Sequence, residues 1–212
     1  MLIAFAGNDG AGKSTQAKAL ARLLQEKGKS VKVIDKWDVI DPAIHPECRF
    51  IDSTLEEVRV CISEMEGPGR ALFLFWCIAL TTTRSLKEPY DYFISDGYWM
   101  KHAAAETAMG NSRAMIEGYI EAMPKPDITF YFDVDPAIAL ERKGADDVTP
   151  YECGCNPEMR PEQFIAHQQR VRAVLKEWAA RDGWITIDAM QDPETIAQQI
   201  AKFVLGRDER VG

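Results

Sequence analysis

The sequence predicts an α/β fold in which a mostly parallel sheet of about five strands carries helices on both faces. Short apolar runs typical of buried strands alternate with helical patterns along the chain, and such alternation is typical of parallel strands joined by helices. A glycine-rich motif stands between the first strand and the helix after it. The 212 residues, 46% hydrophobic and 27% charged, fit one globular domain over residues 1–212.

The first half of the chain contains two of the predicted strands. Gly28 ends the first helical pattern, as glycine commonly does just after a helix. The Gly67-Pro68-Gly69 tripeptide separates the next two helices, because both residue types interrupt regular structure. The predicted elements are strands at residues 2–6 and 31–35 and helices at residues 14–27, 55–65 and 70–86.

The second half continues the alternation. Asp135 is best explained as a helix cap, because Pro136 follows it at the position where proline starts helices. The predicted elements are strands at residues 92–95, 127–133 and 184–187 and helices at residues 136–143, 161–181 and 193–205, and residues 100–123 are expected to be mostly helical.

Residues 144–160 have neither the helical nor the strand period. A segment of this length without regular structure is usually a lid, a binding loop or a disordered surface loop. We expect a lid, which is mobile until a ligand binds and then excludes water from the site.

Charge and composition narrow the classes of function. The chain has 25 basic and 33 acidic residues and a formal net charge of −8, so the basic surface of a protein that binds polymeric nucleic acid is not expected. The longest apolar run, at residues 71–80, is shorter than the ~20 residues that span a bilayer. No targeting pattern is visible and the cysteines are irregularly spaced. We expect a cytoplasmic protein that acts on a small molecule and not on a membrane.

A complete phosphate-binding motif, Gly-x-x-x-x-Gly-Lys-Ser, starts at residue 7. Its glycines let backbone N–H groups point at phosphate oxygens without obstruction by a Cβ atom. Lys13 would place a positive charge near the β- and γ-phosphates, and Ser14 is a natural ligand of Mg²⁺. The motif predicts the three-layer P-loop NTPase fold with ATP and Mg²⁺ as cofactors. The residues expected to bind ATP from this loop are Gly7, Asn8, Asp9, Gly10, Ala11, Gly12, Lys13, Ser14 and Thr15.

Asp96 directly follows the predicted strand at residues 92–95. In parallel sheets, ligands bind in the crevice at the carboxyl ends of the strands, so an acidic residue there faces the ligand. We therefore expect Asp96 to join Ser14 at Mg²⁺.

Several stretches resemble the thymidylate kinase family. Residues 7–16 follow the family's Gly-x-Asp-Gly-x-Gly-Lys-Ser-Thr-Gln throughout, and residues 126–142 are similar to the strand and helix before the family's lid. Asp96-Gly97-Tyr98 and Ala104-Ala105-Glu106 match the family's Asp-Arg-Tyr and Ala-Tyr-Gln in part. The resemblance covers nearly the whole chain and implies ATP as the phosphoryl donor, Mg²⁺, a mobile lid and a homodimer.

The resemblance also assigns roles by position. Asp9 would contact a sugar hydroxyl of the phosphate acceptor, and Asp96 would serve the magnesium and phosphoryl centre, so that Lys13, Asp9 and Asp96 form the catalytic group. Family members without an arginine in the P-loop draw basic groups from the lid. That implies Arg142, Lys143 or Arg160 near the phosphates of ATP.

On the acceptor side the chain departs from the family pattern. The arginine of Asp-Arg-Tyr, which would bind the acceptor phosphate, is Gly97 here. Lys36, Arg49 and Arg84 are the cations available to replace it, and His102 is the histidine best placed to contact a substrate. Aromatic residues at such spacing are more often core than pocket, but flat rings also stack on bases. The candidates for an acceptor pocket are Trp37, Phe75, Trp76, Tyr98 and Trp99.

These observations predict an ATP-dependent kinase of thymidylate (dTMP) or a related nucleoside monophosphate. A kinase of a nucleoside or another uncharged small molecule is an alternative, which the missing arginine would explain. A nucleotide-binding switch protein without an acceptor is the alternative from another class.

Overall fold

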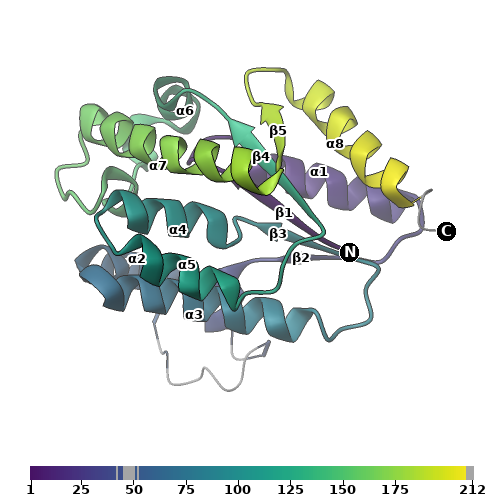
Figure 1. Ribbon diagram of the computed structural model, residues 1–212, viewed down its shortest axis with the longest axis horizontal. Coiled ribbons are helices and arrows are strands. Elements are labelled where there is room, and N and C mark those ends of the chain that lie inside the picture. The colour runs from purple at the N-terminus through teal and green to yellow at the C-terminus, as the bar shows by residue number, and fades with distance from the viewer. Residues whose placement is uncertain (42, 45–50, 52, 209–212) are drawn as a thin grey trace.

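Five parallel strands form one sheet in the computed structural model, which describes residues 1–41, 43–44, 51 and 53–208 (Figure 1). The strands are β1 (Leu2–Gly7), β2 (Val31–Ile34), β3 (Tyr92–Asp96), β4 (Ile128–Asp133) and β5 (Ile185–Asp188). Their order is β2-β3-β1-β4-β5, and each neighbouring pair is parallel. The predicted α/β fold is confirmed, and this sheet is parallel throughout.

Helices cover both faces of the sheet and complete three layers. Figure 1 shows α1 (Lys13–Glu26) and α8 (Pro193–Asp208) together on one face. The other face carries α3 (Gly67–Ser85), α4 (Trp99–Ala108) and α7 (Pro161–Asp182), and α2 (Leu55–Glu64) and α5 (Arg113–Glu121) extend this layer. The short α6 (Pro136–Lys143) follows β4 and packs against α7.

Alternate residues of β1 face the two helical layers, as the period of a strand requires. Ile3 and Phe5 pack in the cluster that includes α1 and α8. Ala4 and Ala6 face the layer of α3, α4 and α7, where Ala103 of α4 is fully buried. Small side chains on both sides let α4 lie close to the sheet, so the first turn of α4 is held near the end of β1.

Helix boundaries follow local capping chemistry. Gly28, at φ +74°, ends α1, and the N–H of Lys29 bonds the carbonyl oxygen of Leu24 at 3.0 Å. Asp135 caps α6 through the N–H of Ala137 at 2.9 Å, as expected. Helix α3 begins three residues earlier than predicted, at Gly67, and takes Pro68 into its first turn.

Residues 100–123 are mostly helical, as predicted, and they form two helices, α4 and α5. Gly110 adopts φ +94°, which ends the helical path after α4. The side chain of Ser112 then caps α5 by accepting from the N–H of Met115.

Residues 144–160 are more regular than the sequence suggested. They contain two short 3-10 helices, η3 (Ala145–Asp147) and η4 (Tyr151–Cys153), and a third, η1 (Lys36–Ile40), follows β2. Val148 and Cys153 pack on Phe164 of α7. Burial of these apolar side chains explains why the segment is folded without a periodic pattern.

Among the described residues, no helix is both long and apolar enough to span a membrane.

Candidate active site

The loop between β1 and α1 is closely packed at one glycine and open at another. A Cβ atom on Gly10 would lie 2.5 Å from the carbonyl oxygen of Ala139, so α6 leaves no room for a side chain. A Cβ atom on Gly12 would meet nothing within 4 Å. Gly12 has φ +86° and caps α1, so the open space lies at the positive end of a helix. That is the cradle the phosphate-binding motif predicts.

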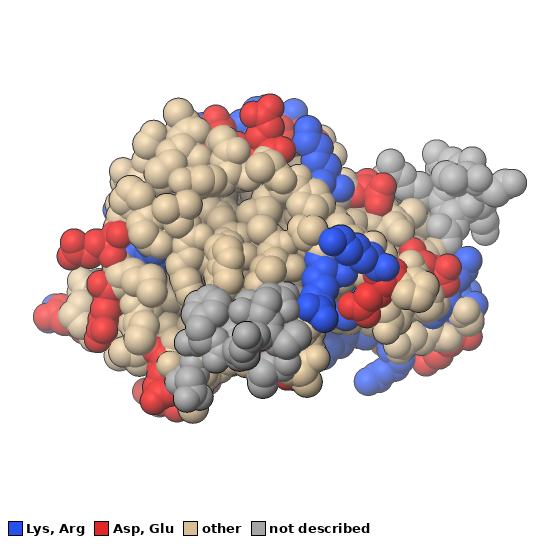
Figure 2. Space-filling view, turned by 90° about the horizontal axis from the view of Figure 1, so that it is seen from below, with Lys and Arg blue, Asp and Glu red and all other residues tan. Residues whose placement is uncertain are grey.

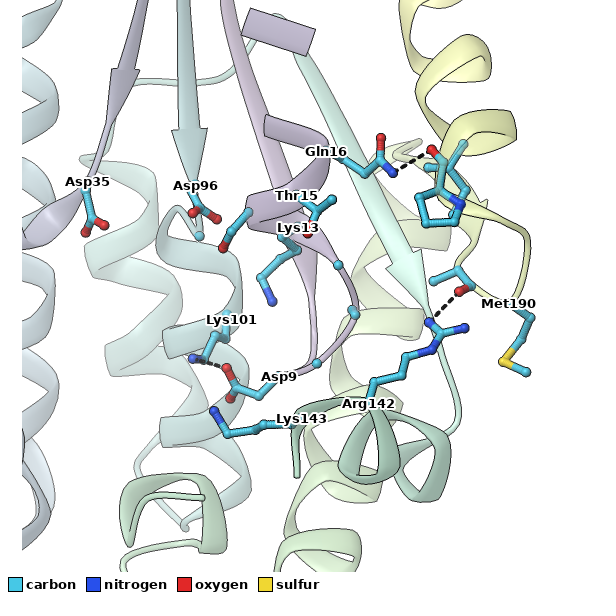
Figure 3. Close-up of a pocket in the computed structure, with 18 of the residues that line it drawn as sticks. Asp9, Lys13, Thr15, Gln16, Asp35, Asp96, Lys101, Arg142, Lys143 and Met190 are labelled. Carbon is cyan, nitrogen blue, oxygen red and sulfur yellow. Dashed lines mark hydrogen bonds and ion pairs between the residues drawn. The ribbon is translucent and has the colours of Figure 1, made fainter. Parts of the chain in front are cut away.

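Two connected hollows lie beside this loop. The larger, about 910 Å³ and here named the P-loop hollow, runs from Asp35 and Asp96 at the ends of β2 and β3 to Arg142 and Met190 (Figure 3). The smaller, about 330 Å³ and here named the inner hollow, overlaps it, and the two share Asp9, Ser14, Lys36, Trp37, Arg59, Lys101, His102 and Lys143. The P-loop hollow brings together most of the predicted site residues, namely Asp9, Gly10, Ala11, Gly12, Lys13, Ser14, Thr15, Trp37, Asp96 and Arg142. Gly7 and Asn8 are buried behind the loop.

Lys13 is buried, and its ammonium nitrogen donates to the carbonyl oxygen of Asn8 at 2.8 Å. Burial lowers the pKa of Lys13 to about 8, although the nearby Asp9 carboxylate works in the opposite direction. A phosphate group in the P-loop hollow would favour the charged form of Lys13.

Asp9 is paired with a residue that the sequence did not single out. Lys101, on the first turn of α4, donates to Asp9 at 2.5 Å, and Lys143 stands beside the same carboxylate (Figure 3). Burial works to raise the pKa of Asp9, but the charges of Lys101 and Lys13 outweigh it and lower the pKa to about 2. Asp9 is therefore ionised at neutral pH. The backbone N–H of Asp9 also donates to Gln168 of α7, which fixes the loop from the other side.

The side chains around Gly12 fit Mg²⁺ bound together with phosphate. Ser14 and Asp96 both line the P-loop hollow. Within the described part of the chain, no three His, Cys, Asp or Glu side chains are grouped to hold a metal ion. Magnesium in kinases commonly takes one or two protein ligands and completes its shell with phosphate oxygens and water. One hydroxyl and one carboxylate suit that arrangement.

The inner hollow collects cations from four separate elements. Lys36 of η1, Arg59 of α2 and Lys101 of α4 all line it, and Lys143 at the end of α6 joins them. Burial, and then the charge of Lys101, lowers the pKa of Lys36 to about 8. Gly97 adopts φ +78°, and a Cβ atom there would meet nothing within 4 Å. Space is therefore left where the family has its arginine.

Sequence reasoning missed Lys101 and Arg59. Lys101 carried one usable signal, because it is a charged residue in the apolar start of a helix, close after Asp96. Arg59 carried none, since it lies on the exposed side of an amphipathic helix.

Several of the residues expected on the acceptor side do not reach these hollows. Phe75 lies on the inward face of α3 and packs on Tyr119 with ring centroids 5.7 Å apart. Tyr98 is buried in the core, and its hydroxyl donates to the carbonyl oxygen of Pro124. Arg84 lies with Trp76 along a separate hollow on α3. Of the remaining candidates, Trp99 is core, and Arg49 lies outside the described residues.

Of the three cations expected from a lid, two border the hollows and one does not. Arg142 borders the P-loop hollow and donates to the carbonyl oxygen of Ala189 at 2.7 Å. Lys143 borders both hollows and lies 3.2 Å from Glu152. Arg160 is exposed and paired with Glu158 instead.

Comparison with known proteins agrees with this geometry. The thymidylate kinase family matches residues 81–200. The thymidylate kinase of Chlorobaculum tepidum is 32% identical over 215 residues, which cover 96% of each chain. The probable thymidylate kinase of Archaeoglobus fulgidus is 29% identical over 96% of this chain and 94% of the relative. The thymidylate kinase of Mycobacterium tuberculosis is 28% identical over 95% and 97%, respectively. The phosphate cradle, the acidic residue at the end of β3 and this similarity along nearly the whole chain identify the protein as a member of the thymidylate kinase family.

Proposed function

We propose that this protein transfers the γ-phosphoryl group of ATP to thymidylate or a closely related nucleoside monophosphate. The observation that carries the proposal is the junction of the two hollows at Asp9 and Ser14, where the phosphate-binding loop borders a cavity rich in cations. Relatives named thymidylate kinase along nearly the full chain support the same reaction.

On the donor side, the loop N–H groups and Lys13 would bind the β- and γ-phosphates of ATP. Ser14 and Asp96 would hold Mg²⁺, which offsets the charge of the transferring group when it is bound. Arg142, one of the cations expected from the lid, borders the same hollow on the side of Met190 (Figure 3). The chain itself contributes position and charge, and phosphoryl transfer demands little else of the protein.

On the acceptor side, Lys101, Lys36 and Arg59 would take the place of the arginine that Gly97 replaces. A charge-assisted hydrogen bond to phosphate contributes roughly 1.5–3 kcal/mol, and two such cations would compensate for the lost one. A lack of cations would favour an uncharged acceptor, but four cations line the inner hollow.

Asp9 would bind the sugar hydroxyl of the acceptor. Its pKa of about 2 keeps it ionised, so it offers only acceptor oxygens to a hydroxyl donor. Lys101 holds the carboxylate in place from α4.

Residues 144–160 would act as the lid. Tyr151 and Glu152 line the inner hollow, so motion of the segment would open that hollow. Closure would exclude water from the transferring phosphoryl group. The expected site of action is the cytoplasm, where nucleotides are available.

A homodimer is part of the proposal because of one apolar face. Val60 of α2 and Leu72 and Trp76 of α3 are exposed at 52%, 45% and 36%, respectively. Figure 2 views the molecule from the side of α3 and shows broad uncharged areas on this face beside a cluster of basic side chains. Large apolar side chains exposed on two consecutive helices are a reason to propose an interaction site there.

The test is ADP release with dTMP, dUMP, dCMP, thymidine and no acceptor. Turnover with dTMP, little with thymidine and almost none without acceptor is the expected result. Lys101→Met should raise the KM for dTMP roughly 10- to 100-fold and leave the KM for ATP nearly unchanged. Arg84→Met, which changes a cation away from both hollows, should leave both constants unchanged. Faster turnover of thymidine than of dTMP would support the uncharged acceptor, and acceptor-independent hydrolysis would support the switch protein.

A further inference from the structure

His102 is a buried histidine with only one of its two ring nitrogens bonded. It is 3% exposed and lines the inner hollow. Its Nδ1 lies 3.3 Å from the hydroxyl oxygen of Tyr151. Its Nε2 is buried and has no hydrogen-bond partner among the described residues. A buried polar atom without a partner is unfavourable and suggests that a ligand completes it.

The partners of Tyr151 decide which ring nitrogen carries the proton. The hydroxyl of Tyr151 lies 3.1 Å from Oε1 of Glu106. Glu106 is paired with Arg70 through two hydrogen bonds of 2.9 and 3.1 Å and also accepts from Asn111 at 2.8 Å. A carboxylate paired in this way only accepts, so the one phenol proton points at Glu106. The phenol oxygen is then an acceptor for His102, and the proton of His102 lies on Nδ1.

It follows that Nε2 of His102 presents a lone pair. Burial, and then the positive charges of Lys36 and Lys101, holds the pKa of His102 well below its usual value, so the ring stays neutral. The unsatisfied nitrogen is an acceptor, and the group that completes it must be a donor.

We propose that His102 selects the base of the acceptor, with Nε2 accepting a hydrogen bond from the N3–H of a thymine or uracil ring. This inference rests on the proposed function and names its specificity determinant. Trp37, Ile62 and Leu74 line the same hollow and provide apolar walls suited to a flat ring. Cytosine has a lone pair at N3, which would face the lone pair of Nε2 and be rejected.

Tyr151 is a positioning residue in this arrangement, because it fixes the tautomer of His102 without touching the base. It belongs to residues 144–160 and is held by Glu106 of α4 and, through Glu106, by Arg70 of α3. Base selection is thus complete only when that segment is folded on α4.

The experiment compares kcat/KM for dTMP, dCMP, N3-methyl-dTMP and 3′-deoxy-dTMP. His102→Ala should lower kcat/KM for dTMP roughly 10- to 100-fold and shrink the preference for dTMP over dCMP. It should cause little further loss for N3-methyl-dTMP, which has no N3 proton to donate. His102→Gln, whose amide presents either an acceptor or a donor, should restore dTMP turnover and raise that of dCMP.

A second measurement reads the tautomer directly. Nitrogen-15 NMR of the ligand-free protein should assign the proton of His102 to Nδ1 in the wild type. In Tyr151→Phe it should show a mixture of the two neutral tautomers, with the proton on Nδ1 or on Nε2. The same variant should relax the preference for dTMP over dCMP. Tyr131→Phe is the matched control, because it also removes a buried hydroxyl bonded to a carboxylate, that of Asp133, and it lines neither hollow. It should change neither readout.

Each contrary outcome has a defined meaning. A proton on Nε2 in the wild type, or an unchanged dTMP to dCMP ratio in His102→Ala while the wild type phosphorylates dTMP, overturns the assignment and leaves the proposed function intact. A loss in His102→Ala that disappears with 3′-deoxy-dTMP overturns it as well, since the sugar would then be the donor. If the wild type phosphorylates no nucleoside monophosphate, the proposed function fails, and the base assignment fails with it.

Discussion

Several individual side chains beside the phosphate-binding loop carry a charge, although burial disfavours their charged forms. Lys13 and Lys36 both have a pKa lowered to about 8 by burial, whereas neighbouring lysines lower that of Asp9 to about 2. A bound anionic ligand would favour the charged forms of both lysines. Ligand binding and protonation of these lysines are therefore coupled.

Lys13→Ala should lower kcat roughly 10²–10³-fold, because one preorganised positive charge at the transferring phosphoryl group is lost. ADP release measures the rate, and thermal unfolding with circular dichroism verifies the fold. Lys18→Ala is the control, since Lys18 lies exposed on the same helix. Unchanged turnover in a folded Lys13→Ala variant would contradict the whole assignment.

Lys36 predicts a pH dependence of acceptor binding. Because its pKa is about 8, the ammonium charge is present below pH 8 and is lost as the pH rises through that value. The KM for dTMP at saturating ATP should then rise above pH 8, approaching about tenfold per pH unit. Lys36→Arg, whose guanidinium stays charged, should flatten the profile. A wild-type KM that is constant from pH 7 to 9.5 would exclude Lys36 as a phosphate contact.

At the scale of the elements, residues 144–160, between α6 and α7, are linked to the phosphate-binding loop through α7. Glu152 of η4 accepts from Gln168 through its backbone, and Gln168 in turn accepts from the N–H of Asp9. One side chain of α7 thus bridges the phosphate loop and the segment that lines the inner hollow.

Amide hydrogen exchange in residues 144–160 should slow when a bisubstrate analogue saturates the protein. The bound ligand would hold Tyr151 and Glu152 against the inner hollow and reduce local opening. Residues of α5, which line neither hollow, provide the internal reference. Equal exchange of residues 144–160 with and without ligand would count against a lid.

At the scale of the whole molecule, the homodimer that we propose would form through the exposed apolar side chains Val60, Leu72 and Trp76. Trp76→Glu should shift the protein from dimer to monomer, because a charge at the centre of such an interface is costly to bury. Sedimentation velocity across protein concentrations measures the change. Phe203→Glu alters a hydrophobic residue that is 51% exposed on α8, and it should leave the dimer intact. A wild type that sediments as a monomer at all concentrations would refute the dimer.

Contiguous stretches of sequence were enough to predict the sheet, the phosphate cradle and the acid at the end of β3. Those features depend on contiguous residues: the apolar period of a strand, the glycines of one loop and the position of Asp96 directly after its strand. The helix ends at Asp135 and Gly28 were also predicted, because capping depends on residues next to each other in the chain. The mostly helical pattern of residues 100–123 did not locate the break at Gly110 that separates α4 from α5.

Which residues line the acceptor side became clear only from the tertiary structure. Lys101 meets Asp9 across 92 positions of sequence, and the cations of the inner hollow come from separate elements. Phe75 and Tyr98 are aromatic residues whose helix faces happen to point into the core, whereas Trp37 reaches the hollow. The tautomer of His102 depends on a chain of contacts from α3 through α4 to η4. Spacing along one helix cannot determine such contacts, because they depend on which neighbouring element each face packs against.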